Sequence, residues 1–141
     1  MPVNYQENME LERELVMEEP YVRVYYLPAI KLGKVVWSGS PANLAEYKKP
    51  FVFLLNYAAT HRVHYFMSDI TNQGVVGPEN RKWFEREAIP AGIKAGLKAS
   101  AIILNDANVF KRYYINAILA INNKTGNPAR IFATSLPRWN G

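Results

Sequence analysis

The residues of this chain that could bind a ligand or do chemistry are polar side chains at the expected ends of two strands. Asp69 closes one strand, and Asn105 follows the apolar run Ala99–Leu104. Open α/β sheets bind ligands beyond the carboxyl ends of their parallel strands. We therefore predict a ligand or partner surface at this edge, formed by Asp69, Thr71, Asn72, Asn105 and Asp106.

The same residue types have a structural interpretation. Asn and Asp side chains commonly accept hydrogen bonds from the backbone two residues further on, and so stabilise turns. No second titratable group stands where it could act with Asp69 as an acid–base pair. The sequence therefore predicts no catalytic residue, and it does not favour an enzyme.

Two histidines are the other candidates for chemistry. His61 and His64 lie three residues apart, but this segment enters an expected strand, where the two side chains would face opposite sides. The chain has no cysteine, so thiolate metal ligands and disulfides are excluded. We expect no metal site and no cofactor.

The loop around Gly74 and Gly77 precedes an expected helix and could cradle an anion with its backbone N–H groups. It matches neither the dinucleotide-binding glycine pattern nor the phosphate-binding loop of nucleotide triphosphatases. Glu79 in the first helical turn would also repel a phosphate. We interpret the segment as an ordinary loop.

Length and composition predict one globular domain. The chain has 141 residues, of which 49% are hydrophobic and 21% charged. Its acidic N-terminal segment lacks the pattern of a secretory signal, and the apolar run Phe51–Leu55 is far too short to span a membrane. The expectation is a soluble, cytoplasmic protein without a membrane span.

The net charge of +5 hides an asymmetry. Residues 1–20 carry six Glu and one Arg, a net charge of −5, whereas the rest carries sixteen basic and six acidic side chains, a net charge of +10. A basic body can indicate a nucleic-acid partner. Because the basic residues are dispersed and form no block, we predict a solvated surface and no nucleic-acid binding.

The first half of the chain predicts an N-terminal arm followed by a hairpin. Residues 1–20 form the expected arm, in which 11–17 form a short strand or a helical turn, and residues 21–141 form the domain. The runs 21–27 and 31–37 predict two antiparallel strands. A helix then begins near Pro41, capped by Ser38 or Ser40, and Pro50 should kink it or divide it in two. A strand at 51–55 is the alternative.

Strands and helices alternate in the second half. We predict strands at 62–69, 99–104 and 129–134, a helix from Pro78 carrying Trp83, a short turn at 91–96, and a helix from Asp106 or Asn108 to Gly126. Such alternation requires right-handed crossovers. The predicted fold is α/β: an N-terminal antiparallel hairpin joined to a mostly parallel four- to five-stranded sheet with helices packed on it.

Aromatic residues are numerous, and some of them suit an interface. Tyrosine can bury its ring while its hydroxyl stays in water. Tyr113 and Tyr114 are adjacent and cannot both face inward on one helix, and Trp139 lies in a short C-terminal segment. We predict these three as interface aromatics.

Several segments together resemble one known superfamily. They are Val36–Trp37–Ser38–Gly39, Met67–Ser68–Asp69, the helix with Trp83, PAGIKAGLK at 90–98 and the buried strand ending in AIIL. In this order they resemble the STAS-like superfamily, the fold of anti-sigma factor antagonists and sulfate-transporter C-terminal domains. More narrowly, the sequence is similar to small uncharacterised bacterial members, over roughly residues 20–134.

The resemblance implies a non-enzymatic protein-interaction or regulatory module with a protein partner or a second copy, as in a homodimer. Regulatory members carry an Asp–Ser–Ser–Gly motif whose serine is phosphorylated. The corresponding segment here, DITNQGVVGPE at 69–79, lacks that motif, and Thr71 is the nearest candidate phosphoacceptor. The alternative function is a small-molecule carrier or sensor that uses the cleft near Asp69 and Asn105.

Overall fold

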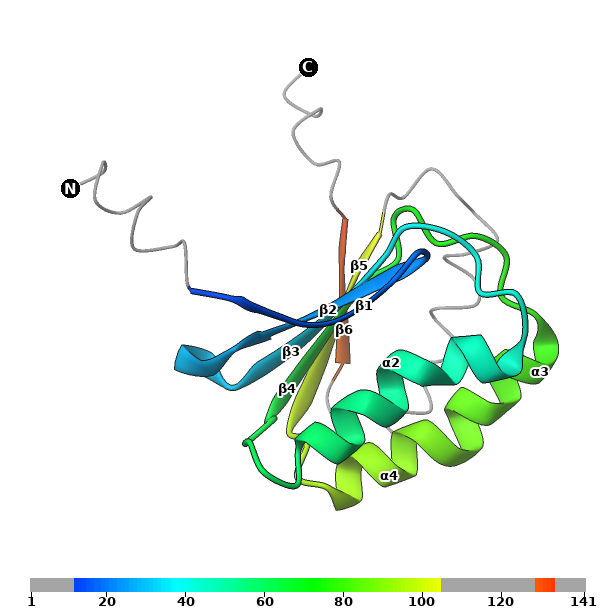
Figure 1. Cartoon of the computed structure of the whole chain (residues 1–141). Helices are drawn as coiled ribbons and strands as arrows, with labels where there is room; N and C mark the ends of the chain where they lie inside the picture. Colours follow the sequence, from blue (N-terminus) through cyan, green and yellow to red (C-terminus); the bar gives the residue numbers. More distant parts are fainter. Residues whose placement is uncertain (1–11, 105–128, 134–141) are drawn as a thin grey trace.

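The computed structural model describes residues 12–104 and the backbone of residues 129–133, and its centre is a six-stranded mixed sheet (Figure 1). The elements in chain order are β1 (Glu14–Glu19), β2 (Val22–Leu27), the single turn η1 (Pro28–Ile30), β3 (Leu32–Trp37), α2 (Leu44–Tyr57), β4 (Tyr65–Asp69), α3 (Pro78–Trp83), η2 (Phe84–Ala88), α4 (Ile89–Lys94), β5 (Ala99–Leu104) and β6 (Ala129–Ala133).

The strands lie in the sheet in their sequence order, β1 to β6. β1, β2 and β3 are antiparallel neighbours, whereas β3, β4, β5 and β6 run parallel. The α/β class is therefore confirmed. The additional strand is β1, which comes from the segment expected to form an arm and pairs with β2 through a bulge between Leu15 and Met17.

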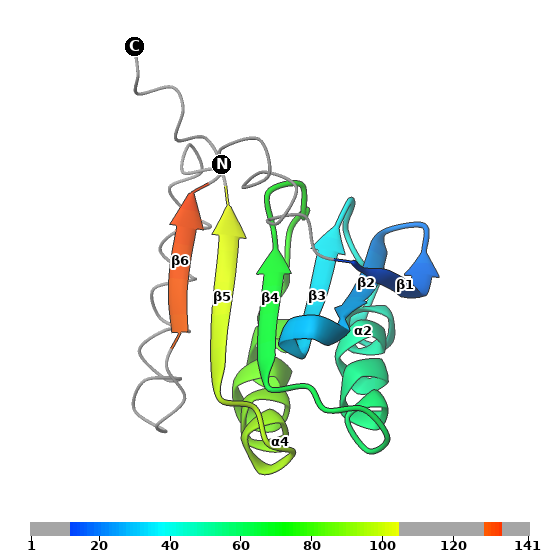
Figure 2. The same cartoon turned by 90° about the vertical axis from the view of Figure 1, so that its left-hand side faces the viewer.

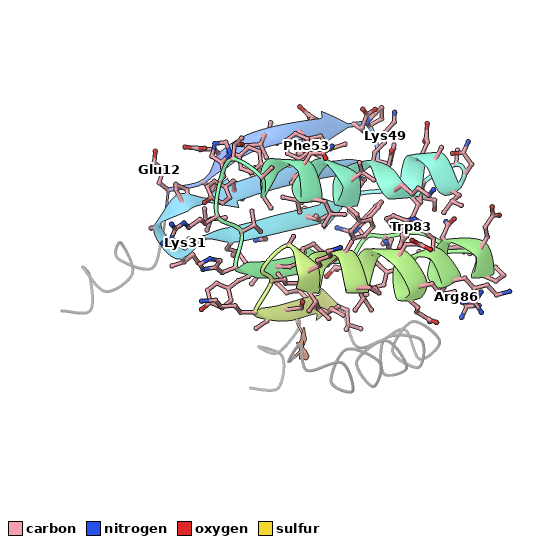
Figure 3. All side chains as sticks on the ribbon, turned by 90° about the horizontal axis from the view of Figure 1, so that it is seen from below. Glu12, Lys31, Lys49, Phe53, Trp83 and Arg86 are labelled. Carbon is pink, nitrogen blue, oxygen red and sulfur yellow. The ribbon has the colours of Figure 1, made fainter. Side chains whose placement is uncertain are left out.

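The helices α2, α3 and α4 cover one face of the sheet, and α2 lies beside the α3–α4 segment (Figures 1 and 3). This follows from the strand order. Two successive right-handed crossovers, β3 to β4 and β4 to β5, advance in the same direction across the sheet, so both connections fall on the same side. Figure 2 shows the other face of the sheet, with the helices behind it.

Helix α2 begins later than predicted. Asn43, in extended conformation, is its N-cap, and its side-chain oxygen accepts a hydrogen bond from the Glu46 backbone N–H at 2.9 Å. The expected caps Ser38 and Ser40 both lie before the helix. Asn is among the best N-cap residues, and Glu at the third helical position also favours a helix start.

Helix α2 continues through Pro50, so the predicted division into two helices is wrong, and another donor replaces the one that proline lacks. Without Pro50 N–H, the carbonyl of Glu46 loses its partner within the helix. The Tyr21 hydroxyl donates to that carbonyl oxygen at 2.7 Å. Burial, followed by the charges of Glu46 and Glu19, raises the pKa of Tyr21 to about 12, so the hydroxyl keeps its proton.

We expect Tyr21→Phe to lower the free energy of unfolding by about 1 kcal/mol, since it leaves the Glu46 carbonyl without a donor. The loss should shrink when Pro50→Ala is also present, because a backbone N–H then returns to the helix. Urea unfolding of the two single variants and the double variant measures this coupling. Strictly additive losses would contradict the assigned role of Tyr21.

The second helical segment also passes through a proline. Ile89 N–H bonds to the Phe84 carbonyl five residues earlier, so η2 is a π-helical turn between α3 and α4. Such turns insert one residue and relieve local conflicts, here next to Pro90. The turn predicted at 91–96 is therefore mostly part of α4. Gly96, with φ of 109°, ends the helix, and Leu97 N–H bonds back to Gly92 O at 3.0 Å.

Aromatic rings form much of the core between α2 and the sheet. The fully buried ring of Trp37 stacks on Tyr47 with ring centroids 5.6 Å apart, and Phe51 lies next to both. Trp83 from α3 contacts the edge of this group. The prediction of a helix that begins at Pro78 and carries Trp83 is confirmed. The buried aliphatic residues around the rings include Val22, Val24, Val35, Leu54, Ile70, Ile102 and Leu104.

The helix predicted from Asp106 or Asn108 to Gly126, and the segment that contains Trp139, lie outside the described residues.

Candidate functional site

In the structure, the polar surface predicted around Asp69 contains a tight turn that Asp69 stabilises. An Asp69 side-chain oxygen accepts a hydrogen bond from Thr71 N–H at 3.1 Å, which is a typical Asx turn. Ile70 N–H continues the sheet ladder to Ile103 O at 2.8 Å. Of the five residues predicted for this surface, the structure brings Asp69 and Thr71 together in this turn. The structural interpretation of Asp69 therefore has direct support.

Thr71, the candidate phosphoacceptor, has a buried hydroxyl oxygen. Among the described residues it finds no hydrogen-bond partner. Phosphorylation there would require the loop to open, because a kinase must reach the hydroxyl. Asn72 is exposed. The other predicted surface and interface residues lie outside the described part of the chain: Asn105, Asp106, Tyr113, Tyr114 and Trp139.

The glycine loop after β4 packs against another loop of the protein. Gly74 N–H donates to Gly39 O at 3.3 Å, so this donor is already used. A Cβ atom on Gly74 would overlap Ser40, which explains the need for glycine at this close approach. These contacts support the interpretation as an ordinary loop.

The two histidines both precede β4 and have different surroundings. The His61 ring stacks on Tyr57, with centroids 3.9 Å apart and planes within 5°, and its Nδ1 lies 2.9 Å from the Thr60 hydroxyl. His64 lies directly before β4. In the described ranges, no three His, Cys, Asp or Glu side chains cluster so that they could hold a metal ion.

A pocket of about 90 Å³ lies between the two helical segments, above β4 and β5. We call it the α2–α4 pocket. Ser100 supplies the one hydroxyl group of its lining, and every other lining residue is apolar or glycine. Its floor is Phe66, Ser100 and Ile102, and its walls are Phe51, Leu54, Leu55, Ala58, Val63, Phe84, Ala88, Ile89, Gly92, Ala95 and Leu97. The chemistry of this lining suits an apolar group.

Basic residues line up at the sheet end nearest this pocket. Lys31, His64 and Lys98 each directly precede one of the parallel strands β3, β4 and β5. His64 N–H donates to Lys31 O at 2.9 Å, and Lys98 N–H donates to His64 O at 2.7 Å. Together with Arg62 we call them the basic row. Figure 3 shows Lys31 at the end of the sheet where α2 ends.

Partial desolvation, followed by the positive charges of Lys98, Lys31 and Arg62, lowers the pKa of His64 below its ordinary value of 6.5. The folded protein therefore binds fewer protons here than the unfolded chain as the pH falls below 6.5. The contribution of His64 to the free energy of unfolding is therefore fully present above pH 6.5 and decreases as the pH falls below that value.

We expect His64→Gln to remove this acid sensitivity and to leave stability unchanged at higher pH. Urea unfolding across the mildly acidic range measures it, with His61→Gln as the matched control. If His64→Gln loses stability in acid as steeply as the unmodified protein, the assignment is wrong.

The second face of the sheet carries a band of apolar side chains. Strand alternation places Tyr25, Val36, Tyr65, Met67 and Ile103 on it, opposite the residues that face the helices. Tyr65 keeps 42% of its surface exposed. We call this surface the open face, because none of the α-helices within the described residues lies on that side (Figure 2). On β2 to β4 its charged members are Arg23, Lys34 and Asp69; Glu18 of β1 forms an ion pair with Arg23 at 2.9 Å, and the Arg13 guanidinium lies over the Tyr25 ring.

Sequence reasoning missed the α2–α4 pocket and the basic row, although the sequence contains a signal for the row. No acidic residue lies between Glu46 and Asp69 or between Glu87 and Asp106. These two segments supply Arg62, His64 and Lys98. Two acid-free segments that enter neighbouring parallel strands predict a basic edge at the amino ends of those strands.

Comparison with known proteins adds no identification. No family model matches the chain, and neither the curated proteins nor the solved structures contain a match. Among the helices described, none combines the length and apolar character needed to cross a membrane.

Proposed function

We propose that this protein is a non-enzymatic, STAS-like interaction module that pairs with a second copy of itself through the open face. The observation that carries the proposal is the band of apolar side chains on β2 to β5 that no described α-helix covers. A sheet face of this kind, with a half-exposed aromatic residue such as Tyr65, is typical of a surface that binds a partner.

Charge complementarity favours a second copy as the partner. Lys34 lies in register with Met67, and Asp69 with Val36, so the lysine and the carboxylate are two positions apart along neighbouring strands. A two-fold axis running across the strands between these positions would stack the two faces and bring Lys34 near Asp69 of the second copy, twice. Among the described residues neither side chain has an ion pair within its own chain.

The interaction would not require the missing serine motif, because its surface is formed by side chains of the sheet rather than by a phosphorylated loop. A second proposed function is the binding of a small molecule. Its support comes from the α2–α4 pocket rather than from the edge near Asp69 and Asn105, since the Asp69 carboxylate already stabilises a turn.

Sedimentation equilibrium on the full chain tests the pairing. We expect a reversible dimer, and we expect Lys34→Glu to raise its dissociation constant at least roughly tenfold, because like charges then meet at two places. Adding Asp69→Lys to Lys34→Glu exchanges the two charges and should restore the dimer. Lys82→Glu on α3 makes the same change of charge on the helical side and serves as the control.

Circular dichroism would establish that each variant is folded before its association is compared. A monomer at every concentration would refute the proposed pairing. So would a dimer that Lys34→Glu and Lys82→Glu weaken equally.

A further inference from the structure

Small residues line part of the α2–α4 pocket. One of them, Gly92, lowers the stability of the helix in which it lies. Gly92 lies inside α4, where glycine is less favourable than alanine. A Cβ atom on Gly92 would meet Leu97 Cδ2 at 3.5 Å, an ordinary contact. Packing therefore does not require glycine here. Its missing side chain adds space to the pocket instead.

The volume of the pocket limits what it can hold. One water molecule needs roughly 10–15 Å³ on this measure, so about 90 Å³ corresponds to a handful of water molecules. An apolar lining with a single hydroxyl group binds water poorly, because water requires several polar partners. The pocket therefore fits a short alkyl chain better than water or a polar metabolite.

The basic row lies next to the end of the α2–α4 pocket that is lined by Val63 and Leu97. Arg62 and His64 flank the lining residue Val63, and Lys98 follows the lining residue Leu97. The charges that act on His64 are those of Lys98, Lys31 and Arg62, and all are positive. Within the described residues none of these cations has an ion pair. If the alkyl tail of a ligand fills the pocket, the polar head group of that ligand therefore lies close to these positive charges.

We infer that the α2–α4 pocket and the basic row form one binding site for a short anionic amphiphile, a molecule with an alkyl tail and a carboxylate or phosphate head. This inference rests on the second proposed function and names its ligand class. The tail packs against Phe66, Leu54 and Ile89, and the head lies among Arg62, His64 and Lys98.

The test is an NMR titration of the full chain with three probes that share one tail: octanoate, octanol and octylammonium. We expect octanoate to bind most tightly and octylammonium most weakly. Arg62→Gln combined with Lys98→Gln should weaken octanoate binding roughly two- to tenfold at low salt and leave octanol binding unchanged. Gly92→Leu should abolish the binding of all three probes, because its side chain fills the pocket.

The outcomes separate the inference from the function on which it rests. If the three probes bind equally well, the selection of an anion is refuted while a small-molecule site remains. If none binds, both the inference and the second function fail. Octyl phosphate and octanoate together distinguish a phosphate head from a carboxylate head. Gly92→Ala, which fills little of the pocket, shows whether loss of binding follows volume rather than loss of glycine.

Discussion

Replacing Trp37 by alanine is expected to lower the free energy of unfolding by about 3–5 kcal/mol, the usual cost of deleting a large buried aromatic residue. Trp37 is 1% exposed and contacts the rings of Tyr21, Tyr47 and Phe51. It connects β3 to α2, so its loss leaves a cavity between sheet and helix. A domain of ordinary stability, about 5–15 kcal/mol, would become marginal.

Urea unfolding followed by circular dichroism measures this loss. Trp37→Phe is the matched control, because it keeps a ring and removes an indole N–H that has no partner among the described residues. Its cost should be clearly smaller than that of Trp37→Ala. A loss below about 1 kcal/mol for Trp37→Ala would contradict the central place of this ring in the core.

Gly33→Val is expected to cost about 2 kcal/mol, because it overpacks the contact between β3 and the buried side chain of Leu54. A Cβ atom at this position would lie 2.9 Å from Leu54 Cδ2 and 3.4 Å from Val63 Cγ1. Leu54 and Val63 also line the α2–α4 pocket, so the added methyl groups should narrow it. Stability and probe binding would then decrease together.

Gly39→Ala is the control for Gly33→Val. Its Cβ atom would lie 3.6 Å from Tyr21 Cβ, an ordinary contact, and we expect little change in stability. Unfolding experiments and an octanol titration on both variants provide the comparison. If Gly33→Val is as stable as the unmodified protein and binds octanol equally well, α2 does not approach the sheet as closely as described.

The sequence predicted the hairpin and the parallel strands well, since period-2 alternation and continuous apolar runs report directly on burial. It failed at Pro50, where division of the helix was one of the two predicted outcomes, and after Pro90, where a short turn was predicted at 91–96 in place of a helix. At Pro50 a tyrosine distant in the sequence supplies the missing hydrogen bond, and at Pro90 a π-helical turn absorbs the conflict. Neither the hydrogen bond from Tyr21 nor the π-helical turn can be predicted from the pattern of neighbouring residues.

The candidate sites were harder to predict for a related reason. Asp69 was noticed for its residue type and position, yet its carboxylate stabilises a turn. The open face was not predicted, because the same alternation describes a sheet covered on one side or on both. The α2–α4 pocket depends on how two helices pack over Ser100 and Phe66, and residue spacing within one segment does not determine that packing.

The most direct test of the proposed function is a dilution series of amide NMR spectra of the full chain. Pairing through the open face predicts concentration-dependent shifts centred on Tyr25, Lys34, Tyr65 and Met67, with α2 and α4 unchanged. Shifts confined to the helices, or no change with concentration, would contradict it.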